Sequence, residues 1–362
     1  MRRTYIVAEA GVNHNGSLAI AKQMVDVAAQ AGANAVKFQT FKAEQLVSKS
    51  APKASYQKAT TDVSVSQFEM LKQLELNAEM HQELSEYCLQ KNIIFLSTPF
   101  DVDSVDLLIN QCNISIMKIP SGEITNAPLI LKIGQTNKPV ILSTGMSTLG
   151  EIEIALGVLA FGYLKLNTKP SLAQFLATYY SELGQAILQK KVTLLHCTTE
   201  YPAPFNEVNL NNIETLRTAF DLPVGFSDHT EGIAVSLAAV ARGAVLIEKH
   251  FTLDKNLPGP DHKASLEPQG LQQMIQGIRQ IEQALGSTVK MPTPAERKNK
   301  SMARRSLVAA KNIAKGDIFS EINLGIKRPG DGISPMDYWN WLGRKADRDY
   351  KEDEKVKKWT DQ

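Results

Sequence analysis

The stretch Leu222–His262, LPVGFSDHTEGIAVSLAAVARGAVLIEKHFTLDKNLPGPDH, predicts how most of this 362-residue chain folds. Two short apolar runs, Val224–Phe226 and Ala244–Ile247, each lead into a polar triplet that ends in histidine. These histidines are His229 and His250. A helical pattern separates the two runs, and a strand, a crossover helix and a second strand place the two strand ends side by side in a parallel sheet. We therefore expect both histidines in one crevice.

Two imidazoles in one crevice can be interpreted in two ways. They suit a divalent metal ion that keeps coordination positions open for substrate or water. An isolated pair is more often two unrelated capping or core histidines. Other features of the sequence are needed to choose between a metal site and two structural histidines.

The pattern of an apolar run followed by a helix recurs along the chain. The eight runs are Tyr5–Ala8, Ala35–Phe38, Ile93–Leu96, Ile114–Ile119, Val140–Leu142, Val192–Leu195, Val224–Phe226 and Ala244–Ile247. Such an alternation predicts the α/β class and a (β/α)8 TIM barrel, whose parallel strands are buried on both faces and are therefore uniformly apolar. An open doubly wound sheet is the alternative, but AEAGVNHNG (8–16) lacks the GxGxxG spacing typical of that fold.

The character of the chain changes after Gly286. We expect a barrel domain over 1–286, a charged and proline-containing linker over 287–303, and a small domain over 304–362. In the small domain, strand-like runs occur at Ser306–Ala309, Ile318–Phe319 and Leu324–Ile326. Its three tryptophans, Trp339, Trp341 and Trp359, are expected to supply much of its core. In the barrel domain, the polar region from Lys42 to about Val65 predicts a long loop over the strand ends, of the kind that acts as a lid.

Composition excludes several classes of function. A formal charge of +2 does not suggest nucleic acid or an anionic membrane as a partner. The three cysteines have no CxxC spacing, which favours reduced thiols and a cytoplasmic protein. The first apolar run is too short for a signal peptide, and no stretch has the length of a membrane span.

Every predicted strand ends in polar or ionisable side chains. They are Glu9, Lys37, Ser97, Thr98, Lys118, Ser121, Glu123, Ser143, His196, Thr198, Ser227, His229, Glu248 and His250. A single strand-end lysine or serine is usually an ion-pair partner or a helix cap. Polar or ionisable side chains at the ends of eight successive strands favour an active site, because barrel enzymes have their active sites at the carboxyl ends of the strands.

The chemistry of these side chains suggests a ligand. Lysines and hydroxyl groups suit a molecule with a phosphate and a carboxylate, and phosphoenolpyruvate carries both. A lysine could instead form a Schiff base with a carbonyl substrate. The histidine pair favours a metal Lewis acid with electrostatic binding, and the residues alone leave both routes open.

Several motifs, taken in order, resemble the sialic acid synthases, which condense phosphoenolpyruvate with an N-acetylated hexosamine to give a nine-carbon 2-keto acid. The matching stretches are AEAGVNHNG (8–16), VKFQTF (36–41), LSTPFD (96–101), KIPSGEITNAPL (118–129), ILSTGM (141–146), LLHCTTEYPAP (194–204), GFSDHT (225–230), IEKHFT (247–252) and PGPDHKASLEP (258–268). RRSLVA (304–309) and IKRPGDGI (326–333) resemble the antifreeze-like (SAF) domain that follows the barrel in this family. The resemblance therefore implies a TIM barrel followed by an SAF domain.

The resemblance also implies a role for individual residues. His229 and His250 would bind Mn²⁺ or Mg²⁺, with Glu9 beside the metal-bound water and Glu123 orienting or deprotonating the attacking water. Phosphoenolpyruvate would be held by Lys37, Thr98, Lys118, Ser121, Ser143 and Ser227. The sugar would contact Tyr201, Asp261 and Arg328. In the family, a domain-swapped homodimer brings the arginine at this last position into the partner's active site.

Two departures from the family pattern concern the acceptor sugar. Thr199 stands where N-acetylneuraminate synthases commonly have asparagine, and the lid-like stretch 53–76 differs from theirs. The chain looks most like bacterial synthases of N,N'-diacetyllegionaminate, whose acceptor is 2,4-diacetamido-2,4,6-trideoxymannose. N-Acetylmannosamine, giving N-acetylneuraminate, and the pseudaminate precursor are the alternative acceptors. A carbohydrate- or ice-binding protein is the alternative from another class, although a binding surface needs no paired lysines and glutamates in a pocket.

Overall fold

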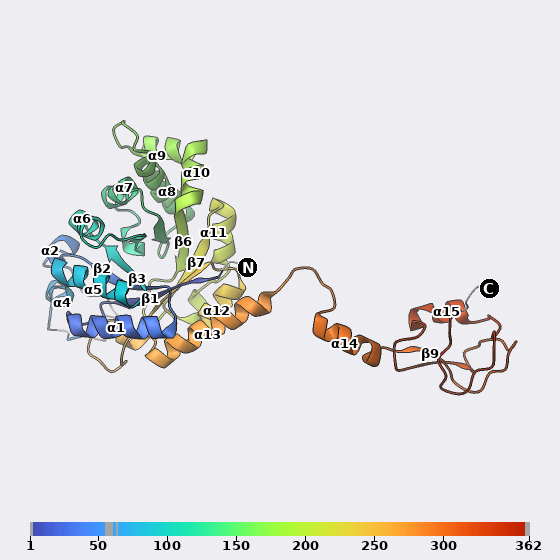
Figure 1. Cartoon of the computed structure of the whole chain (residues 1–362). Coiled ribbons are helices and arrows are strands. Elements are labelled where there is room, and N and C mark those ends of the chain that lie inside the picture. Colours follow the sequence, from blue (N-terminus) through green and yellow to red (C-terminus); the bar gives the residue numbers. More distant parts are fainter. Residues whose placement is uncertain (1–2, 55–60, 63, 359–362) are drawn as a thin grey trace. The chain divides into compact units, whose positions relative to one another are not determined.

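The chain forms two compact units, Met1–Gly286 and Ser287–Gln362 (Figure 1). The structure is a computed structural model, and it describes residues 3–54, 61–62 and 64–358. None of the helices formed by these residues has the length and apolar character needed to cross a lipid bilayer. The three cysteines are buried and free.

A parallel eight-stranded sheet forms the centre of the first unit. Its strands are β1 (Tyr5–Gly11), β2 (Ala35–Thr40), β3 (Ile94–Pro99), β4 (Met117–Ile119), β5 (Val140–Ser143), β6 (Val192–Cys197), β7 (Val224–Asp228) and β8 (Leu246–His250). The strand order is β3-β2-β1-β8-β7-β6-β5-β4. The first and last strands of this order also pack against each other. The predicted (β/α)8 barrel is confirmed, and the open doubly wound sheet is excluded.

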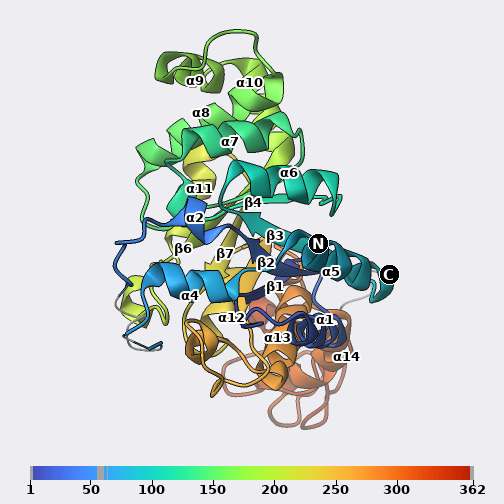
Figure 2. The ribbon, with the colours of Figure 1, turned by 90° about the vertical axis from the view of Figure 1, so that its left-hand side faces the viewer.

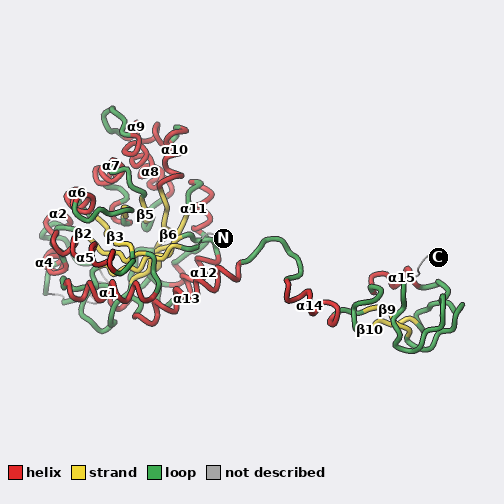
Figure 3. The backbone as a smooth tube through the Cα atoms, in the orientation of Figure 1, coloured by secondary structure: helices red, strands yellow, loops and turns green. Residues whose placement is uncertain are grey.

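Helices surround the sheet on the outside, as Figure 3 shows in red around the yellow strands. They are α1 (Leu18–Ala31), α5 (Ala78–Gln90), α6 (Val102–Asn110), α7 (Ala127–Gln135), α8 (Leu149–Leu164), α11 (Asn212–Phe220), α12 (Ala234–Ala241) and α13 (Pro268–Leu285). Local signals set their ends. Ser17 caps α1 by accepting a hydrogen bond from the Ile20 N–H, and Gly32 ends the helix in the left-handed region at φ 85°.

Two insertions add further helices to the barrel. α2 (Ala43–Leu46) and α4 (Gln67–Leu74) lie between β2 and α5, within and just after the predicted lid loop. Residues 55–60 and 63 of that loop lie outside the described residues. α9 (Leu172–Tyr179) and α10 (Glu182–Lys191) precede β6 and pack against α8.

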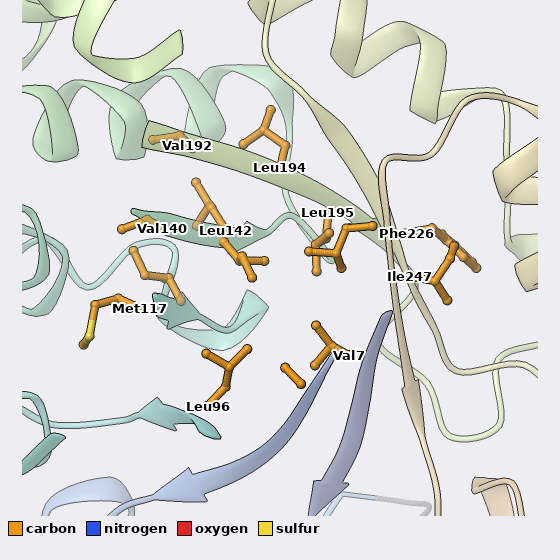
Figure 4. Packing of buried hydrophobic residues seen from close by; sticks show 14 of the residues in the cluster. Val7, Leu96, Met117, Val140, Leu142, Val192, Leu194, Leu195, Phe226 and Ile247 are labelled. Carbon is orange, nitrogen blue, oxygen red and sulfur yellow. The ribbon is translucent and has the colours of Figure 1, made fainter. Parts of the chain in front are cut away.

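Apolar side chains on both faces of the sheet, toward the barrel interior and toward the surrounding helices, form the core (Figure 4). Those labelled there are Val7, Leu96, Met117, Val140, Leu142, Val192, Leu194, Leu195, Phe226 and Ile247, and each is at most 2% exposed. Burying one such side chain contributes on the order of 1.5–3 kcal/mol. The core therefore anchors the strands on which the polar residues stand.

Most strands extend beyond the apolar runs that predicted them. β1 reaches Gly11 instead of Ala8, and β8 reaches His250 instead of Ile247. The polar residues at these strand ends therefore belong to the sheet itself. Their side chains alternate between the barrel interior and the surrounding helices.

The second unit contains a short helix and a small sheet. α14 (Pro294–Ala303) is a helix within the predicted linker, begun by a capping box of Thr293 and Glu296. β9 (Ser306–Ala309) pairs antiparallel with β10 (Leu324–Lys327), and α15 (Tyr338–Trp341) follows. Ile318, predicted in a strand, forms only an isolated bridge with Lys345.

The tryptophans of the second unit differ from one another. Trp341 is 6% exposed and packs in the core with Phe319 and Tyr350. Trp339 is 77% exposed, so its predicted core role is wrong. Residues two apart on a helix point in nearly opposite directions, and only one of this pair can face the core. Trp359 lies outside the described residues.

Candidate active site

A cavity of about 300 Å³ lies at the carboxyl ends of the barrel strands. Its lining includes eleven of the predicted site residues: Glu9, Lys37, Thr98, Lys118, Ser121, Ser143, Tyr201, Ser227, His229, His250 and Asp261. Residues far apart in the sequence therefore converge, as the strand-end argument predicts.

The strand register explains how the charged residues meet. Glu9 on β1 is level with Lys37 on β2 and with His250 on β8. Ser227 on β7 is level with Glu248 on β8. Because side chains alternate along a strand, Glu248 and His250 both face the interior and Lys249 between them faces outward.

Two lysines and two glutamates form a buried network in the floor of the cavity. Lys37 Nζ lies 2.6 Å from Glu9 Oε2 and 3.7 Å from Glu248 Oε2. Lys118 Nζ lies 3.3 Å from Glu248 Oε1, which also accepts a hydrogen bond of 2.9 Å from Ser227 Oγ. These charged side chains are at most 6% exposed. Each lysine thus has an anionic partner within the protein.

The network shifts the pKa values of its two carboxyl groups in opposite directions. Burial raises the pKa of Glu9 to about 7, since Lys37 offsets only part of the desolvation. Burial also acts to raise the pKa of Glu248, but Lys118 and Lys37 together outweigh it and hold that pKa at about 2. Glu9 is therefore suited to exchange a proton near neutral pH, whereas Glu248 stays ionised.

The same carboxylates also affect the pKa values of Lys37 and Lys118. Burial acts to lower the pKa of Lys37, but the carboxylates of Glu248 and Glu9 raise it above its ordinary value. Burial lowers the pKa of Lys118, and the carboxylate of Glu248 offsets only part of this decrease. Lys37 is accordingly the more strongly held cation.

Glu248 is the residue to which the sequence reasoning assigned no role. The sequence predicts Glu248 only as a strand-end residue, whereas in the structure it contacts Lys37, Lys118 and Ser227. The available signal was the alternation in β8, since a residue two positions before His250 faces the same interior.

His229 and His250 lie close together, with ring centroids 5.7 Å apart. The Nδ1–H of His229 donates a hydrogen bond of 2.6 Å to the Thr198 carbonyl, which leaves the lone pair on Nε2. Nδ1 of His250 is buried and has no hydrogen-bond partner among the described residues. Tyr201 stacks against His229 with a centroid distance of 4.2 Å.

The histidine pair suits a divalent metal ion. Burial lowers the pKa of His229 to about 4 and that of His250 well below its ordinary value, so both rings are neutral at pH 7. Neutral imidazoles with free ring nitrogens are good ligands for divalent metals. Within the described ranges, however, no three His, Cys, Asp or Glu side chains are arranged to hold a metal. An ion on these two histidines would take its other ligands from elsewhere, such as substrate or water.

A cluster of small polar groups lies beside Lys118. Ser121 Oγ accepts a hydrogen bond of 3.0 Å from the Gly145 N–H and lies 3.2 Å from Cys197 Sγ. Thr199 Oγ1 is buried and has no hydrogen-bond partner in the part of the chain that the structure describes. A Cβ at Gly145 would lie 2.4 Å from that oxygen and 2.8 Å from Ser121 Oγ. Only glycine fits here without displacing the two hydroxyl groups.

Two predicted site residues are not among those of the barrel unit that line the cavity. Glu123 is half-buried, and its carboxylate accepts a hydrogen bond of 2.7 Å from Asn126 instead of lining the cavity. Arg328 belongs to the second unit. Their proposed roles remain predictions. Asp261 does line the cavity, and burial raises its pKa to about 6.

A buried ion pair supports the histidine-bearing strand ends from outside the barrel. Lys249 Nζ lies 3.1 Å from Asp228 Oδ2, and both side chains are fully buried. The carboxylate also accepts hydrogen bonds from the hydroxyls of Thr230 and Ser236, while Lys249 donates to the Thr230 carbonyl. The pair thus ties β7 to β8 one residue away from each histidine.

Replacing Lys249 by methionine is expected to lower the free energy of unfolding by about 3–5 kcal/mol, because it leaves a buried carboxylate without its cation. Denaturant unfolding of the barrel, followed by circular dichroism, measures the change. Lys22→Met is the matched control, because Lys22 pairs with Glu83 on the surface. It should cost less than about 1 kcal/mol. Equal losses for the two variants would contradict this account of the buried pair.

Comparison with known proteins connects this site to a family. The model of the NeuB family matches residues 24–290, and the model of the SAF domain matches residues 304–358. N,N'-diacetyllegionaminic acid synthase of Campylobacter jejuni is 53% identical over 99% of this chain and 100% of its own length. The enzyme of that name from Legionella pneumophila is 45% identical over 94% of this chain and 89% of its own.

A solved structure shares the fold. The N-acetylneuraminic acid (sialic acid) synthetase of Leptospira borgpetersenii, in complex with citrate, superposes with a TM-score of 0.66 at 32% identity. The match covers 82% of this chain and 90% of that one. The predicted family resemblance and the predicted SAF domain are both confirmed.

Proposed function

Because the chain belongs to the NeuB family of sialic acid synthases, we propose that it condenses phosphoenolpyruvate with 2,4-diacetamido-2,4,6-trideoxymannose and water. The products are N,N'-diacetyllegionaminate and phosphate. The observation that carries this proposal is the 53% identity, over nearly all of both chains, to a synthase of that product. The cavity at the strand ends supplies cationic and hydroxyl groups that suit the first substrate.

Lysines and hydroxyl groups would hold phosphoenolpyruvate. We assign its phosphate and carboxylate to Lys37, Thr98, Lys118, Ser121, Ser143 and Ser227, all of which line the cavity. Lys37 donates a hydrogen bond of 3.1 Å to Thr98 Oγ1, so these two groups are already aligned. Fixed cations in a buried site stabilise negative charge better than mobile water does.

The reaction forms one carbon–carbon bond and replaces the carbon–oxygen bond to phosphate at C2 by a carbon–oxygen bond to water. C3 of phosphoenolpyruvate attacks the aldehyde carbon of the open-chain sugar, which leaves an oxocarbenium centre at C2. Water adds to C2, and phosphate departs with its bridging oxygen. Glu9, whose pKa is raised to about 7, would take up or release one of the protons involved. Tyr201 and Asp261 would contact the sugar.

We assign a divalent metal, Mn²⁺ or Mg²⁺, to His229 and His250, which fit it as described above. Lewis-acid polarisation of a carbonyl oxygen is the chemistry that such an ion supplies when bound. The two histidines would orient the acceptor's aldehyde toward C3 of phosphoenolpyruvate. Glu123 is the candidate for orienting the attacking water, provided that its carboxylate leaves Asn126.

Phosphate release tests the proposed function. The protein is mixed with Mn²⁺, phosphoenolpyruvate and, in separate reactions, the 2,4-diacetamido sugar, N-acetylmannosamine or the pseudaminate precursor. The diacetamido sugar should give the highest kcat/KM. A higher value with either other sugar would reassign the acceptor, and intact phosphoenolpyruvate in all three would refute the enzyme in favour of a carbohydrate-binding protein.

Replacing Gly145 by alanine is expected to raise KM for phosphoenolpyruvate about tenfold or more, because the new Cβ displaces the hydroxyls of Ser121 and Thr199. The displaced groups are side-chain ends, so the fold should remain intact. Steady-state kinetics at saturating sugar measure the change. Gly150→Ala is the control, since a Cβ there meets no atom within 4 Å. An unchanged KM in G145A would remove this cluster from the substrate site.

We further propose that the protein acts as a domain-swapped homodimer in the cytoplasm and that Arg328 completes the partner's sugar site. Arg328→Ala should then lose most activity while sedimenting as a dimer. Mixing this variant with a barrel-inactive variant such as Lys118→Met should restore part of the activity, because one mixed site carries both intact residues. Activity equal to that of the unaltered protein in R328A would contradict the role of the arginine.

A further inference from the structure

The cavity has two chemically different walls. The charged and hydroxyl-bearing residues described above come from the strand ends. Five further side chains of the lining, all apolar, come from the insertion between β2 and α5: Leu46, Val47, Met70, Leu71 and Leu74. We name this set the apolar wall. Nothing in the chemistry of phosphoenolpyruvate, which is anionic at both ends, requires it.

The helix α4 is built to present such a wall. Gln67, Met70, Leu71 and Leu74 lie three or four residues apart, so they share one face of the helix and all line the cavity. Glu69, Lys72 and Gln73 occupy the solvent-exposed face. A capping box of Ser66 and Glu69 begins the helix. The helical spacing of these residues therefore puts apolar side chains on the face of α4 that lines the cavity.

Contacts behind the wall hold it in place. Met70 and Leu74 are buried and pack with Val12 and Phe41 in a small cluster separate from the barrel core. Lys72 forms an ion pair with Glu44 at 2.9 Å, which links α4 to α2. Figure 2 shows these two helices on the same side of the strands. Leu46, Val47 and Leu71 are only half-buried, so part of their apolar surface remains for a ligand.

Resting on the proposed function, we propose that the apolar wall binds the end of the acceptor sugar that carries the C6 methyl group and the acetyl group on N4. The aldehyde carbon has to lie at the strand ends, beside the histidine pair and phosphoenolpyruvate. In the open-chain sugar, C4 to C6 then extend away from the strand ends, toward the side chains that the insertion contributes to the cavity. Leu71, the half-buried apolar residue on the cavity-lining face of α4, is the residue that selects for the 6-deoxy sugar.

The chemistry of the two acceptors explains the selection. 2,4-Diacetamido-2,4,6-trideoxymannose has a methyl group at C6, whose burial against aliphatic side chains is favourable. A sugar with a hydroxyl at C6 would lose water there and find no hydrogen-bond partner on an aliphatic wall. A hydrophobic pocket discriminates against an added hydroxyl by up to about a hundredfold. The wall contributes to binding and not to the chemical step, so its effect belongs in KM.

A pair of sugars that differ only at C6 tests the proposal. The probes are 2,4-diacetamido-2,4,6-trideoxymannose and 2,4-diacetamido-2,4-dideoxymannose, each with phosphoenolpyruvate and Mn²⁺ on the full-length protein. The unaltered protein should prefer the 6-deoxy sugar by about ten- to a hundredfold in kcat/KM. In Leu71→Asn this preference should fall to within about threefold, through a higher KM for the deoxy sugar and an unchanged KM for phosphoenolpyruvate.

Matched variants separate selection from general damage. Leu71→Met keeps the wall apolar and should retain the preference. Leu89→Asn makes the same substitution on α5, at a side chain that is 79% exposed and lies outside the cavity. It should leave the sugar preference and the KM values unchanged. Val47→Thr, nearly identical in shape, provides a second polar change in the wall if Leu71→Asn does not fold, and it should reduce the preference as well.

The outcomes distinguish this inference from the proposed function. If neither diacetamido sugar supports phosphate release by the unaltered protein, the proposed function fails. If the unaltered protein turns over both sugars without preference, or if L71N and V47T keep the full preference, the apolar wall does not select the 6-deoxy sugar and the proposed function stands. A preference that collapses in L71N and V47T but survives in L71M and L89N supports the inference.

Discussion

His229→Ala and His250→Ala should each lower kcat/KM by about a hundredfold to ten-thousandfold, because Lewis-acid stabilisation of charge in a transition state is worth several kcal/mol. Both rings are buried and neutral. Nδ1 of His250 has no hydrogen-bond partner among the described residues, and Nε2 of His229 has only a long contact of 3.4 Å with Ser227 Oγ, whose proton is donated to Glu248. Their loss should also weaken Mn²⁺ binding, measured directly by the electron paramagnetic resonance signal of the free ion.

The control for the histidine variants removes a buried imidazole elsewhere. His81 on α5 is fully buried and shares a hydrogen bond of 2.8 Å with Thr40 Oγ1, and it does not line the cavity. His81→Asn should lose stability but keep Mn²⁺ binding and turnover. Treatment with a chelator should abolish turnover of the unaltered protein, and Mn²⁺ should restore it. Full activity of either alanine variant, or of the metal-free protein, would refute the metal assignment.

Lys118→Met should reduce kcat/KM for phosphoenolpyruvate by about a hundredfold to a thousandfold, the cost of removing one fixed charge-stabilising donor from a buried site. Lys118 is 5% exposed and its burial lowers its pKa, so its charge depends on an anion nearby. Glu248 is that anion in the free protein. Titration with phosphoenolpyruvate by calorimetry measures the loss of binding independently of turnover.

A double variant separates binding from stability at Lys118. Removing the lysine alone leaves Glu248 with a more distant cation, Lys37 at 3.7 Å, so part of the effect could come from a weakened fold. Glu248→Gln removes this weakly paired carboxylate charge. The double variant K118M/E248Q should therefore regain unfolding stability without regaining affinity for phosphoenolpyruvate. Recovered affinity would mean that Lys118 serves the fold and not the substrate.

Schiff-base formation by a lysine, the alternative mechanism, can be tested with the same enzyme assay. Borohydride added during turnover would trap a Schiff base on Lys37 or Lys118 as a covalent adduct visible by mass spectrometry. At Lys37 the network argues against such an adduct, because Glu9 and Glu248 hold this lysine as a cation and an ammonium group is not nucleophilic. Lys118, whose pKa is lowered by burial, is the lysine for which the trapping experiment decides. An adduct would overturn the electrostatic mechanism.

Much of the fold was predictable because burial has a simple signature in sequence. Strands enclosed on both faces are uniformly apolar, and all eight runs correspond to strands of the barrel. The limits of the strands were less predictable. Glu9 and His250 look like loop residues because they are polar, but they continue β1 and β8, whose backbone hydrogen bonds do not depend on side-chain polarity. In the second unit, Trp339 is exposed because a four-residue helix buries only one of two alternate tryptophans.

Much of the site was also predictable, since parallel strands bring all their carboxyl ends to one place. Eleven of the predicted residues line one cavity. Glu123 does not, because its carboxylate is taken up by Asn126 three residues later, a local contact that strand-end reasoning ignores. The importance of Glu248 was missed because its partners, Lys37 and Lys118, are far away in sequence.

The sequence by itself determined which groups reach the strand ends, because the alternation of side chains along each strand is local and has a period of two. It also determined the apolar face of α4, because that face repeats with the helical period. Only the tertiary structure decided which charges became partners. Closing the sheet into a barrel put Glu9 between Lys37 and His250 and put Glu248 between two lysines. Their opposite pKa shifts follow from this arrangement, since a charge buried in a medium of low polarity depends on its nearest neighbours in space.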